Sequence, residues 1–250
     1  MAGQAHFRFW GRLSKLVAGA AGETAIAYRF RGNPAVKDSI EALGLPHTEV
    51  DMILVFGRSV GFDYRLQADD QVAVFPFGGE VARGGEVHLS PPLPDKPRFI
   101  LDVHLGKLAR RLRMLGFDCR YRNDYSDSQV IELAQAEGLI ILTRDRGILK
   151  HACVRQGYLI GSDQVDEQVL EVLDRYRLVN KICPLYRCPR CNGLLKSVAK
   201  EKVMHRLLPK TAQYYQNFRQ CYSCRQLYWQ GSHYLKIERW ITKIVAAAKQ

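Results

Sequence analysis

Long apolar runs are absent from this sequence of 250 residues. No segment reaches the roughly 18 apolar residues that a membrane-spanning helix needs, so we expect no membrane partner. The first residues lack the basic stretch, apolar core and cleavage site of a signal peptide, and no glycine-rich nucleotide-binding loop is present. These absences predict a cytoplasmic protein. The apolar content of 47% is enough to give more than one domain its own core.

The sequence has seven cysteines, an odd number, so they cannot all be paired in disulfides within the chain. Four of them form two Cys-x-x-Cys pairs, Cys188 with Cys191 and Cys221 with Cys224, which in a reducing compartment indicate metal ligands rather than disulfides. Four thiolates suit tetrahedral zinc and leave no open position, so the predicted zinc is structural. The 29 residues between the pairs exceed the common spacing and need a hairpin or loop of their own.

Other side chains could enter this zinc site. Cys183 lies nearby in the sequence and could replace one ligand, although its spacing fits less well, and His205 or His233 could give a mixed site. Polar contacts are the simpler interpretation for both histidines. We expect Cys119 and Cys153 to be core residues.

Acidic residues are nearly missing from the last quarter of the chain. Residues 183–250 hold 13 Lys and Arg against 2 Asp and Glu, so this segment carries +11 of the total net charge of +12. Concentrated positive charge indicates a polyanion partner. Aromatic side chains are interleaved with it, at Tyr214, Tyr215, Phe218, Tyr222, Tyr228, Trp229 and Tyr234. Some of these rings could stack on unpaired bases, and Tyr215 and Trp229 are the candidates for this role. Others could fill a small core around zinc.

Residues 1–80 have the pattern of a small β-grasp, ubiquitin-like domain, with the order strand, strand, helix, strand, strand. Asn33 is the expected helix cap, Pro34 the first helical residue and Gly44 the stop. The strands are expected at residues 6–13, 22–32, 50–56 and 71–77.

Residues 81–97 are a predicted linker, in a glycine- and proline-rich stretch that begins at Gly78-Gly79. Ubiquitin-like sulfur carriers end in a free Gly-Gly whose carboxylate is activated. Here 171 residues follow Gly79, so a flexible exit from the domain is the better interpretation.

Residues 98–182 repeat strand then helix, which predicts an α/β domain with a parallel sheet. The apolar run at 139–143 is typical of a buried parallel strand. In the first helix, the leucines at 105, 108, 112 and 115 share one face, and Gly116 ends the helix. The other side is expected to be basic and solvated, with Lys107, Arg110, Arg111 and Arg113.

Aspartates follow the apolar runs of this segment, at Asp102, Asp124, Asp127, Asp145 and Asp163. The carboxyl ends of parallel strands meet at one edge of the sheet, which is where open α/β sheets bind ligands. Carboxylates gathered there repel one another unless a cation lies between them, and Mg²⁺ or Mn²⁺ prefers oxygen ligands. We therefore expect a metal-dependent hydrolase with these residues as candidate catalytic acids.

Each acid also has a simpler interpretation. Asp102 could cap the helix at 104–115, and Asp163 lies in an ordinary N-cap sequence. Asp124 and Asp127 compete for one role, in which Asp127 is favoured slightly, although it could cap the helix at 128–137. The basic candidates for RNA contact are Lys107, Arg110 and Arg111 on the first helix and Arg144 and Arg146 beside Asp145, and all could instead be solvated charges.

Several long motifs now point to one family. The segments FILDVHLGKLARRLRMLGFD, ILTRDRGIL and YWQGSHY, together with the two cysteine pairs, resemble the Mut-seven C-terminal ribonuclease family, a PIN-like nuclease with a zinc ribbon. Residues 5–77, with AVKDSIEALG at 35–44, resemble the ubiquitin-like domain that precedes this nuclease in bacterial members. The resemblance implies a PIN-like fold over 98–182, a zinc ribbon over 183–250, and a metal-dependent ribonuclease activity.

The sequence thus predicts a multidomain α+β and α/β protein that hydrolyses RNA. Asp102, Asp127 and Asp145 would hold Mg²⁺ or Mn²⁺, and the basic zinc ribbon would hold the RNA. One alternative is an RNA-binding protein without catalysis. Another is a protein-interaction or sulfur-carrier-like role led by the ubiquitin-like domain, which could in any case have a protein partner.

Overall fold

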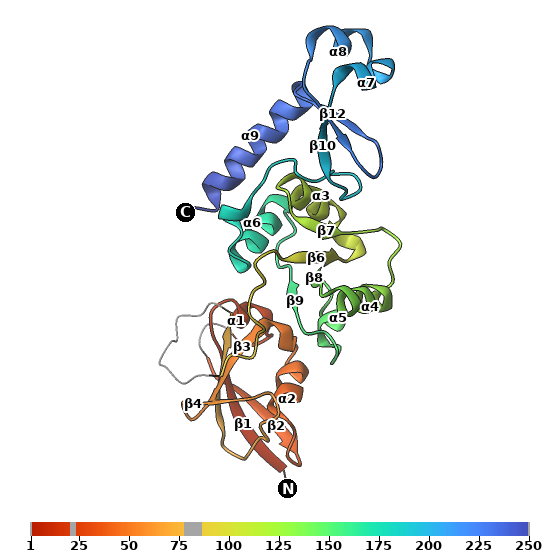
Figure 1. Cartoon of the computed structure of the whole chain (residues 1–250). Coiled ribbons are helices and arrows are strands. Elements are labelled where there is room, and N and C mark those ends of the chain that lie inside the picture. Colours follow the sequence, from red (N-terminus) through yellow and green to blue (C-terminus); the bar gives the residue numbers. More distant parts are fainter. Residues whose placement is uncertain (1, 21–23, 78–86, 250) are drawn as a thin grey trace. The chain divides into compact units, whose positions relative to one another are not determined.

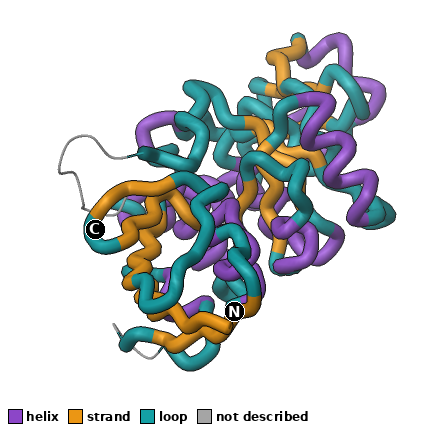
Figure 2. The backbone as a smooth tube through the Cα atoms, turned by 90° about the horizontal axis from the view of Figure 1, so that it is seen from below, coloured by secondary structure: helices purple, strands orange, loops and turns teal. Residues whose placement is uncertain are grey.

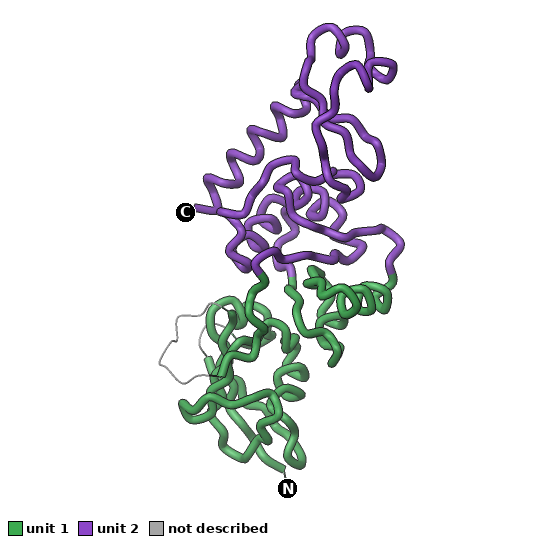
Figure 3. Tube along the Cα trace, viewed as in Figure 1, with its two compact units in different colours: residues 1–94, 126–159 green, residues 95–125, 160–250 purple. Residues whose placement is uncertain are grey.

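The computed structural model describes residues 2–20, 24–77 and 87–249. The chain divides into two compact units, coloured separately in Figure 3. Unit 1 combines residues 1–94 with 126–159, and unit 2 combines residues 95–125 with 160–250. Most helices and strands are short, with loops between them (Figure 2).

Unit 1 contains a five-stranded sheet in the order β2-β1-β5-β3-β4. The central pair β1 and β5 is parallel, and the other neighbours are antiparallel, which is the β-grasp arrangement that the sequence predicts. The elements of its first segment are β1 (Ala2–Phe9), α1 (Leu13–Leu16), β2 (Ile26–Arg31), α2 (Val36–Ala42), the 3-10 helix η1 (His47–Glu49), β3 (Val50–Val55), β4 (Arg58–Val60) and β5 (Gln71–Pro76), labelled in Figure 1 where there is room.

The start of α2 differs from the prediction. Ala35, not Asn33, is the N-cap, and the helix begins at Val36. The cause is pairing of the preceding backbone, because Ala35 forms an antiparallel bridge with Arg65 and the carbonyl of Pro34 accepts the N–H of Leu66 at 3.0 Å. The predicted stop is confirmed, since Gly44 follows the helix with a φ of +98°. The Gly78-Gly79 pair and some residues of the predicted linker lie outside the described residues.

The second segment of unit 1 holds α4 (Asp127–Glu137), β8 (Ile140–Thr143), α5 (Arg146–Lys150) and β9 (Gly157–Leu159). Strands β8 and β9 are parallel, and every residue of both is buried. This confirms the apolar run at 139–143 as a buried strand, and the helices on either side give it the predicted α/β character.

A polar network joins the β-grasp portion of unit 1 to α5 and β9. Glu49 is 2% exposed, and its carboxylate accepts bonds from the Arg12 guanidinium and from the backbone N–H of Leu159, both at 2.6 Å. Arg12 also donates to the Leu159 carbonyl at 2.8 Å and lies 4.1 Å above the Tyr158 ring. We call the contacts among Arg12, Glu49 and Leu159 the Glu49 brace.

Three further contacts run from the β-grasp portion to the same segment. His47 Nε2 lies 2.9 Å from the Val154 carbonyl, Lys150 Nζ donates to the Glu41 carbonyl at 2.6 Å, and Arg146 donates to the Gly44 carbonyl at 3.1 Å. Every one of them uses a backbone carbonyl as one partner. Each contact therefore ties a side chain of one segment to the backbone of the other.

Unit 2 begins with the parallel pair β6 and β7, followed along the chain by helices and the cysteine-rich segment. Leu105, Leu108, Leu112 and Leu115 are all buried, as predicted, and each such side chain contributes roughly 1.5–3 kcal/mol of burial free energy. The elements are β6 (Arg98–Leu101), η2 (Val103–Leu105), α3 (Gly106–Met114), β7 (Asp118–Arg120), α6 (Val165–Arg175), η3 (Val179–Lys181), β10 (Leu195–Val198), α7 (Lys200–Val203), η4 (Met204–Arg206), α8 (Pro209–Tyr214), β11 (Phe218–Cys221), β12 (Leu227–Trp229) and α9 (Ser232–Ala247).

The cysteine-rich segment is joined tightly to the end of α3. Gly116 has a φ of +100°, and a Cβ at this position would collide with the carbonyl oxygen of Cys183. The N–H of Cys183 donates to the Leu115 carbonyl, and that of Leu185 donates to the Met114 carbonyl, both at 2.9 Å. This junction therefore requires glycine at 116 for conformation and for space.

The 29 residues between the cysteine pairs form structure of their own, as their length requires. Strands β10, β11 and β12 make an antiparallel three-stranded sheet, and α7 and α8 lie in the connection between β10 and β11. The sixteen-residue helix α9, for which the sequence analysis made no prediction, then packs against α6 (Figure 1). No helix in the described ranges is both long and apolar enough to cross a bilayer.

Candidate functional sites

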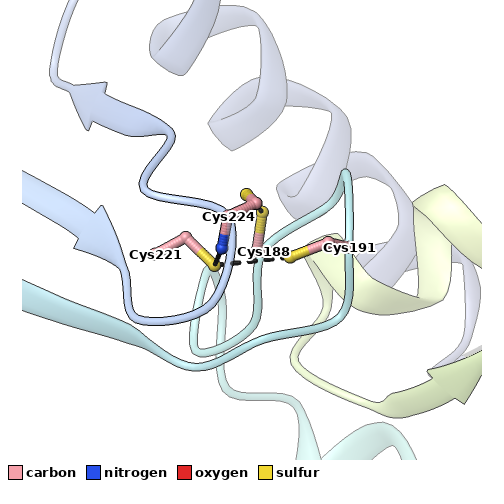
Figure 4. Close-up of side chains that lie close together, drawn as sticks. All are labelled: Cys188, Cys191, Cys221 and Cys224. Carbon is pink, nitrogen blue, oxygen red and sulfur yellow. Dashed lines mark hydrogen bonds between the residues drawn. The ribbon is translucent and has the colours of Figure 1, made fainter.

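The structure brings together the four cysteines of the two predicted pairs. Their Sγ atoms all lie within 4.8 Å of one another, with Cys188 3.7 Å from Cys224 and Cys191 3.4 Å from Cys221 (Figure 4). All four thiols are free. Tetrahedral coordination with metal–sulfur bonds of about 2.3 Å places the sulfurs roughly 3.8 Å apart. The four thiols can therefore hold one metal ion, and neither Cys183 nor a histidine belongs to the group.

Each cysteine pair lies in a tight turn that aims both sulfurs to one side. The Cys188 carbonyl accepts the N–H of Asn192 at 2.9 Å, and the Cys221 carbonyl accepts the N–H of Arg225 at 3.1 Å. Asn192 and Arg225, each the residue after the second cysteine of its pair, have φ of +70° and +61°. The repeated left-handed residue closes both turns in the same way, so the two halves of the site match.

The thiols differ in proton affinity. Burial raises the pKa of Cys191 to about 12. Burial also acts to raise the pKa of Cys221, but hydrogen bonds from the backbone N–H of Cys224 and from the Cys191 thiol stabilise its thiolate and bring the pKa to about 7. Four adjacent thiolates would repel one another strongly, so full ionisation of the cluster requires a cation at its centre.

Tyr228 adds a hydrogen bond to this cluster. Its hydroxyl lies 3.0 Å from Cys188 Sγ, and burial followed by the hydrogen bond to Cys188 raises its pKa, so the phenol stays neutral and donates to the sulfur. Outer hydrogen bonds of this kind orient a metal ligand and tune its basicity. The sequence pattern places Tyr228 only among rings that could stack or fill a core.

Arg113 ties α3 to the first cysteine turn. It was predicted on the solvated face of the helix, but it is only 4% exposed. Its guanidinium donates to the Cys119 carbonyl at 2.9 Å and to the Arg190 carbonyl at 3.2 Å, where Arg190 lies between the two cysteines of the pair. Burial lowers the pKa of Arg113 from its very high usual value, and nearby thiolates oppose this shift.

A second polar link runs beside Arg113. Asn192 donates to Asp118 at 2.6 Å and accepts the N–H of Cys119 at 3.1 Å, while Arg187 donates to Asp118 at 2.8 Å. Cys119 is fully buried, as expected, and burial raises the pKa of its thiol. Cys153 was expected in the core and is exposed, because it lies in the turn between α5 and β9.

Three of the predicted acids belong to unit 2. Asp102 directly follows β6 and is 3% exposed; it precedes η2, but its side chain accepts no capping bond there. Asp124 is exposed, and Arg122 donates to both of its carboxylate oxygens, at 2.9 and 2.7 Å, which lowers the pKa of Asp124. Asp163 is exposed, and the N-cap of α6 is Gln164 rather than Asp163.

The other two predicted acids belong to unit 1. Asp127 is exposed and is the first residue of α4, whose cap is Ser126 in a capping box with Gln129. Asp145 follows β8 and caps α5, with its Oδ1 accepting the N–H of Gly147 at 2.6 Å. A Cβ at position 147 would lie 3.0 Å from Asp145 Oδ1, so this glycine leaves room for the carboxylate. Gly147 was not among the predicted site residues.

The predicted RNA-contact residues have different surroundings. Lys107, Arg110 and Arg144 are exposed, and Arg146 is exposed with its guanidinium on the Gly44 carbonyl. Arg111 is half-buried and lies 4.3 Å above the ring of Trp240. Tyr215 is half-buried against the small core around Phe218, and Trp229 is 37% exposed.

Comparison with known proteins gives a consistent picture. A family model described as the Mut7-C RNAse domain matches residues 97–241, and one described as Mut7-C ubiquitin matches residues 2–81. A search of curated proteins found no match, and a search of solved structures found none either.

Proposed function

Because the chain belongs to the family of the Mut7-C RNAse domain, which covers residues 97–241, we propose that it is a ribonuclease that hydrolyses the phosphodiester bonds of RNA with the help of divalent cations. The family match is the observation that carries this proposal. A ubiquitin-like domain before the nuclease, at residues 2–81, further supports the assignment to the form of the family that carries both domains.

The proposed catalytic acids are Asp102, Asp127 and Asp145, which would hold one or two Mg²⁺ or Mn²⁺ ions. Such ions lower the pKa of a bound water and neutralise charge on the phosphate. Asp102 supports this role because an aspartate at the end of a strand is seldom so fully buried. The Gly147 N–H fixes the orientation of Asp145 through Oδ1 and leaves Oδ2 as the oxygen for a cation.

Asp127 is preferred to Asp124 as the third acid that would hold the catalytic cation, beside Asp102 and Asp145. Arg122 already engages both carboxylate oxygens of Asp124, so a cation would have to displace a bidentate pair. Asp127 is exposed in the first turn of α4, at the positive end of the helix dipole, and among the described residues no ion pair engages its carboxylate. Asp163 remains the weakest candidate of the five acids, because it is exposed beside a helix start.

We propose zinc as the ion of the cysteine cluster. The donor set of four thiolates at tetrahedral spacing fits a soft, closed site, and the hydroxyl of Tyr228 and the cation of Arg113 offset some of its negative charge. With no open position, this ion would stabilise the fold of unit 2 and would not take part in hydrolysis. The proposed setting is the cytoplasm, where thiols stay reduced.

The decisive experiment compares RNA cleavage with Mn²⁺, with Mg²⁺ and with EDTA. Asp145→Asn and Asp102→Asn should each abolish cleavage, because both keep the size of the side chain and remove a metal-binding charge. Asp174→Asn, at an exposed position near the end of α6, is the matched control and should cleave like the wild type. Circular dichroism of all three variants separates lost catalysis from lost folding. Cleavage that persists in EDTA or in both test variants would refute the metal mechanism.

An RNA-binding protein without catalysis is the second candidate, favoured by the net charge of +11 over residues 183–250. It predicts RNA binding under all three metal conditions and no cleavage under any of them.

A further inference from the structure

A groove in unit 2 combines positive charge with aromatic faces. It has a volume of about 810 Å³ and is lined by residues of α3, α8, β12 and α9. Its ionisable lining includes four Lys and Arg side chains, Arg110, Arg111, Lys210 and Lys236, and contains no Asp or Glu. The lining therefore carries a net positive charge, which favours an anionic ligand.

The aromatic side chains of the groove come from separate elements. Tyr214 at the end of α8 is 70% exposed, Trp229 at the end of β12 is 37% exposed, and Trp240 lies on α9. Aromatic rings of this size are mostly buried in folded proteins. A group of exposed rings often marks a binding site. Two such rings beside four cations match the combination that holds the bases and phosphates of a single strand.

One wall of the groove is already arranged for binding. The Arg111 guanidinium stacks 4.3 Å above the Trp240 ring, and Asp166 Oδ1 accepts the Trp240 indole N–H at 2.8 Å while lying 4.0 Å from Arg111 Nε. Asp166 therefore fixes the ring, and the ring fixes the cation. A ligand phosphate that meets Arg111 finds a side chain with little conformational freedom left to lose.

We propose that this groove binds a short stretch of single-stranded RNA, with bases against Tyr214 and Trp229 and phosphates against Lys210, Lys236 and Arg111. The proposal rests on the proposed ribonuclease function and names the form of substrate that it takes. A duplex keeps its bases stacked inside and offers them no access to these rings, so the groove selects unpaired RNA. The volume falls in the range of roughly 300–1,000 Å³ of pockets that enclose a ligand the size of a nucleotide.

The chain provides a close control for this proposal. Tyr222 is 68% exposed, lies in the same basic segment with Lys196 and Arg225 near its ring, and does not line the groove. Tyr214→Ala and Tyr222→Ala thus remove the same ring from similarly charged, exposed positions. Neither ring is in a core, so both variants should fold.

The test measures binding of a fluorescent oligouridylate and of an RNA duplex of equal length to the full chain in EDTA, where hydrolysis is blocked. Tyr214→Ala should weaken single-strand binding by about tenfold, as expected for loss of one stacked base. Tyr222→Ala should change it less than twofold, and the duplex should bind more weakly than the single strand. Lys236→Ala, compared with Lys202→Ala outside the groove, should reduce the salt dependence of binding.

Equal losses in Tyr214→Ala and Tyr222→Ala would overturn the proposal, because the positive charge alone would then hold the RNA. Equal affinity for single strand and duplex would do the same, as would an acidic peptide that displaces the oligouridylate at equal concentration. Binding in the groove and cleavage with Mn²⁺ are separate measurements. Cleavage without groove binding refutes only the groove, and groove binding without cleavage under any metal refutes only the ribonuclease.

Discussion

The Glu49 brace makes a quantitative prediction about unit 1. Glu49→Ala removes the acceptor of the buried Leu159 N–H, and an unsatisfied buried donor costs about 1–3 kcal/mol. It also leaves the Arg12 guanidinium without its partner at 2.6 Å, but Arg12 is 28% exposed, so water compensates much of that loss. The free energy of unfolding of unit 1 should therefore fall by about 3 kcal/mol. This is less than the largest losses, about 5 kcal/mol, that follow when one partner of a fully buried ion pair is removed.

Two measurements follow from this estimate. Unit 1 is intermediate in size between small and large domains, so at roughly 4 °C per kcal/mol its melting transition should shift down by about 12 °C. Hydrogen exchange should show faster exchange of the Leu159 amide. Glu132→Ala, a truncation of the same residue type at an exposed site of α4, is the control and should change the unfolding free energy by less than about 0.5 kcal/mol. A Glu49→Ala protein that melts like this control and keeps its Leu159 amide protected would refute the reasoning.

The remaining predictions concern the cysteine cluster and its surroundings. Removal of metal with a strong chelator should unfold the segment after residue 183 and leave the β-grasp sheet intact. Near- and far-ultraviolet circular dichroism would show this loss of structure. An unchanged spectrum after complete metal loss would contradict the structural role of the metal. Tyr228→Phe should weaken metal affinity by roughly tenfold or more, measured by competition with a chromophoric chelator, whereas the exposed control Tyr214→Phe should leave it unchanged. Arg113→Met should lower stability by about 1–3 kcal/mol in denaturant unfolding, because it leaves the buried carbonyl of Cys119 without its donor and removes a second bond to the Arg190 carbonyl. A loss under about 0.5 kcal/mol would show that water replaces the guanidinium.

The sequence predicted best what depends on regular periodicity and on spacing. The leucines of α3, the buried strand β8, the β-grasp order and the gathering of the four cysteines all agree with the structure. The helical repeat, the apolar run and the Cys-x-x-Cys turn are local rules, and here no distant segment of the chain competes with them.

The errors occur where a distant segment supplies a partner. Asn33 would be a good helix cap, but pairing of Ala35 with Arg65 keeps the backbone extended to Ala35. Arg113 lies on a basic helix face by its sequence, yet backbone carbonyls from the cysteine turn make its burial favourable. The role of Tyr228 comes from its contact with Cys188, and the role of Gly147 comes from the space it leaves for Asp145. No single-sequence pattern records such pairings.

The proposed catalytic acids illustrate a different limit. The sequence places Asp102 and Asp145 at the ends of apolar runs, and both do follow strands. Their environments could not be foreseen, since Asp102 is almost fully buried while Asp145 is exposed and held by a backbone N–H. Burial depends on what packs over a strand end, and that is decided by segments far away in the chain.

The junction at Gly116 also bears on how this protein can evolve. The backbone hydrogen bonds from Cys183 and Leu185 to the carbonyls of Leu115 and Met114 cross the point where gene recombination would separate the segment that holds α3 from the cysteine-rich segment. After a crossover there, the recipient chain would need glycine at the position that matches Gly116, and its helix would have to end with carbonyls placed to accept these two N–H groups. We therefore expect the cysteine-rich segment to be inherited together with α3.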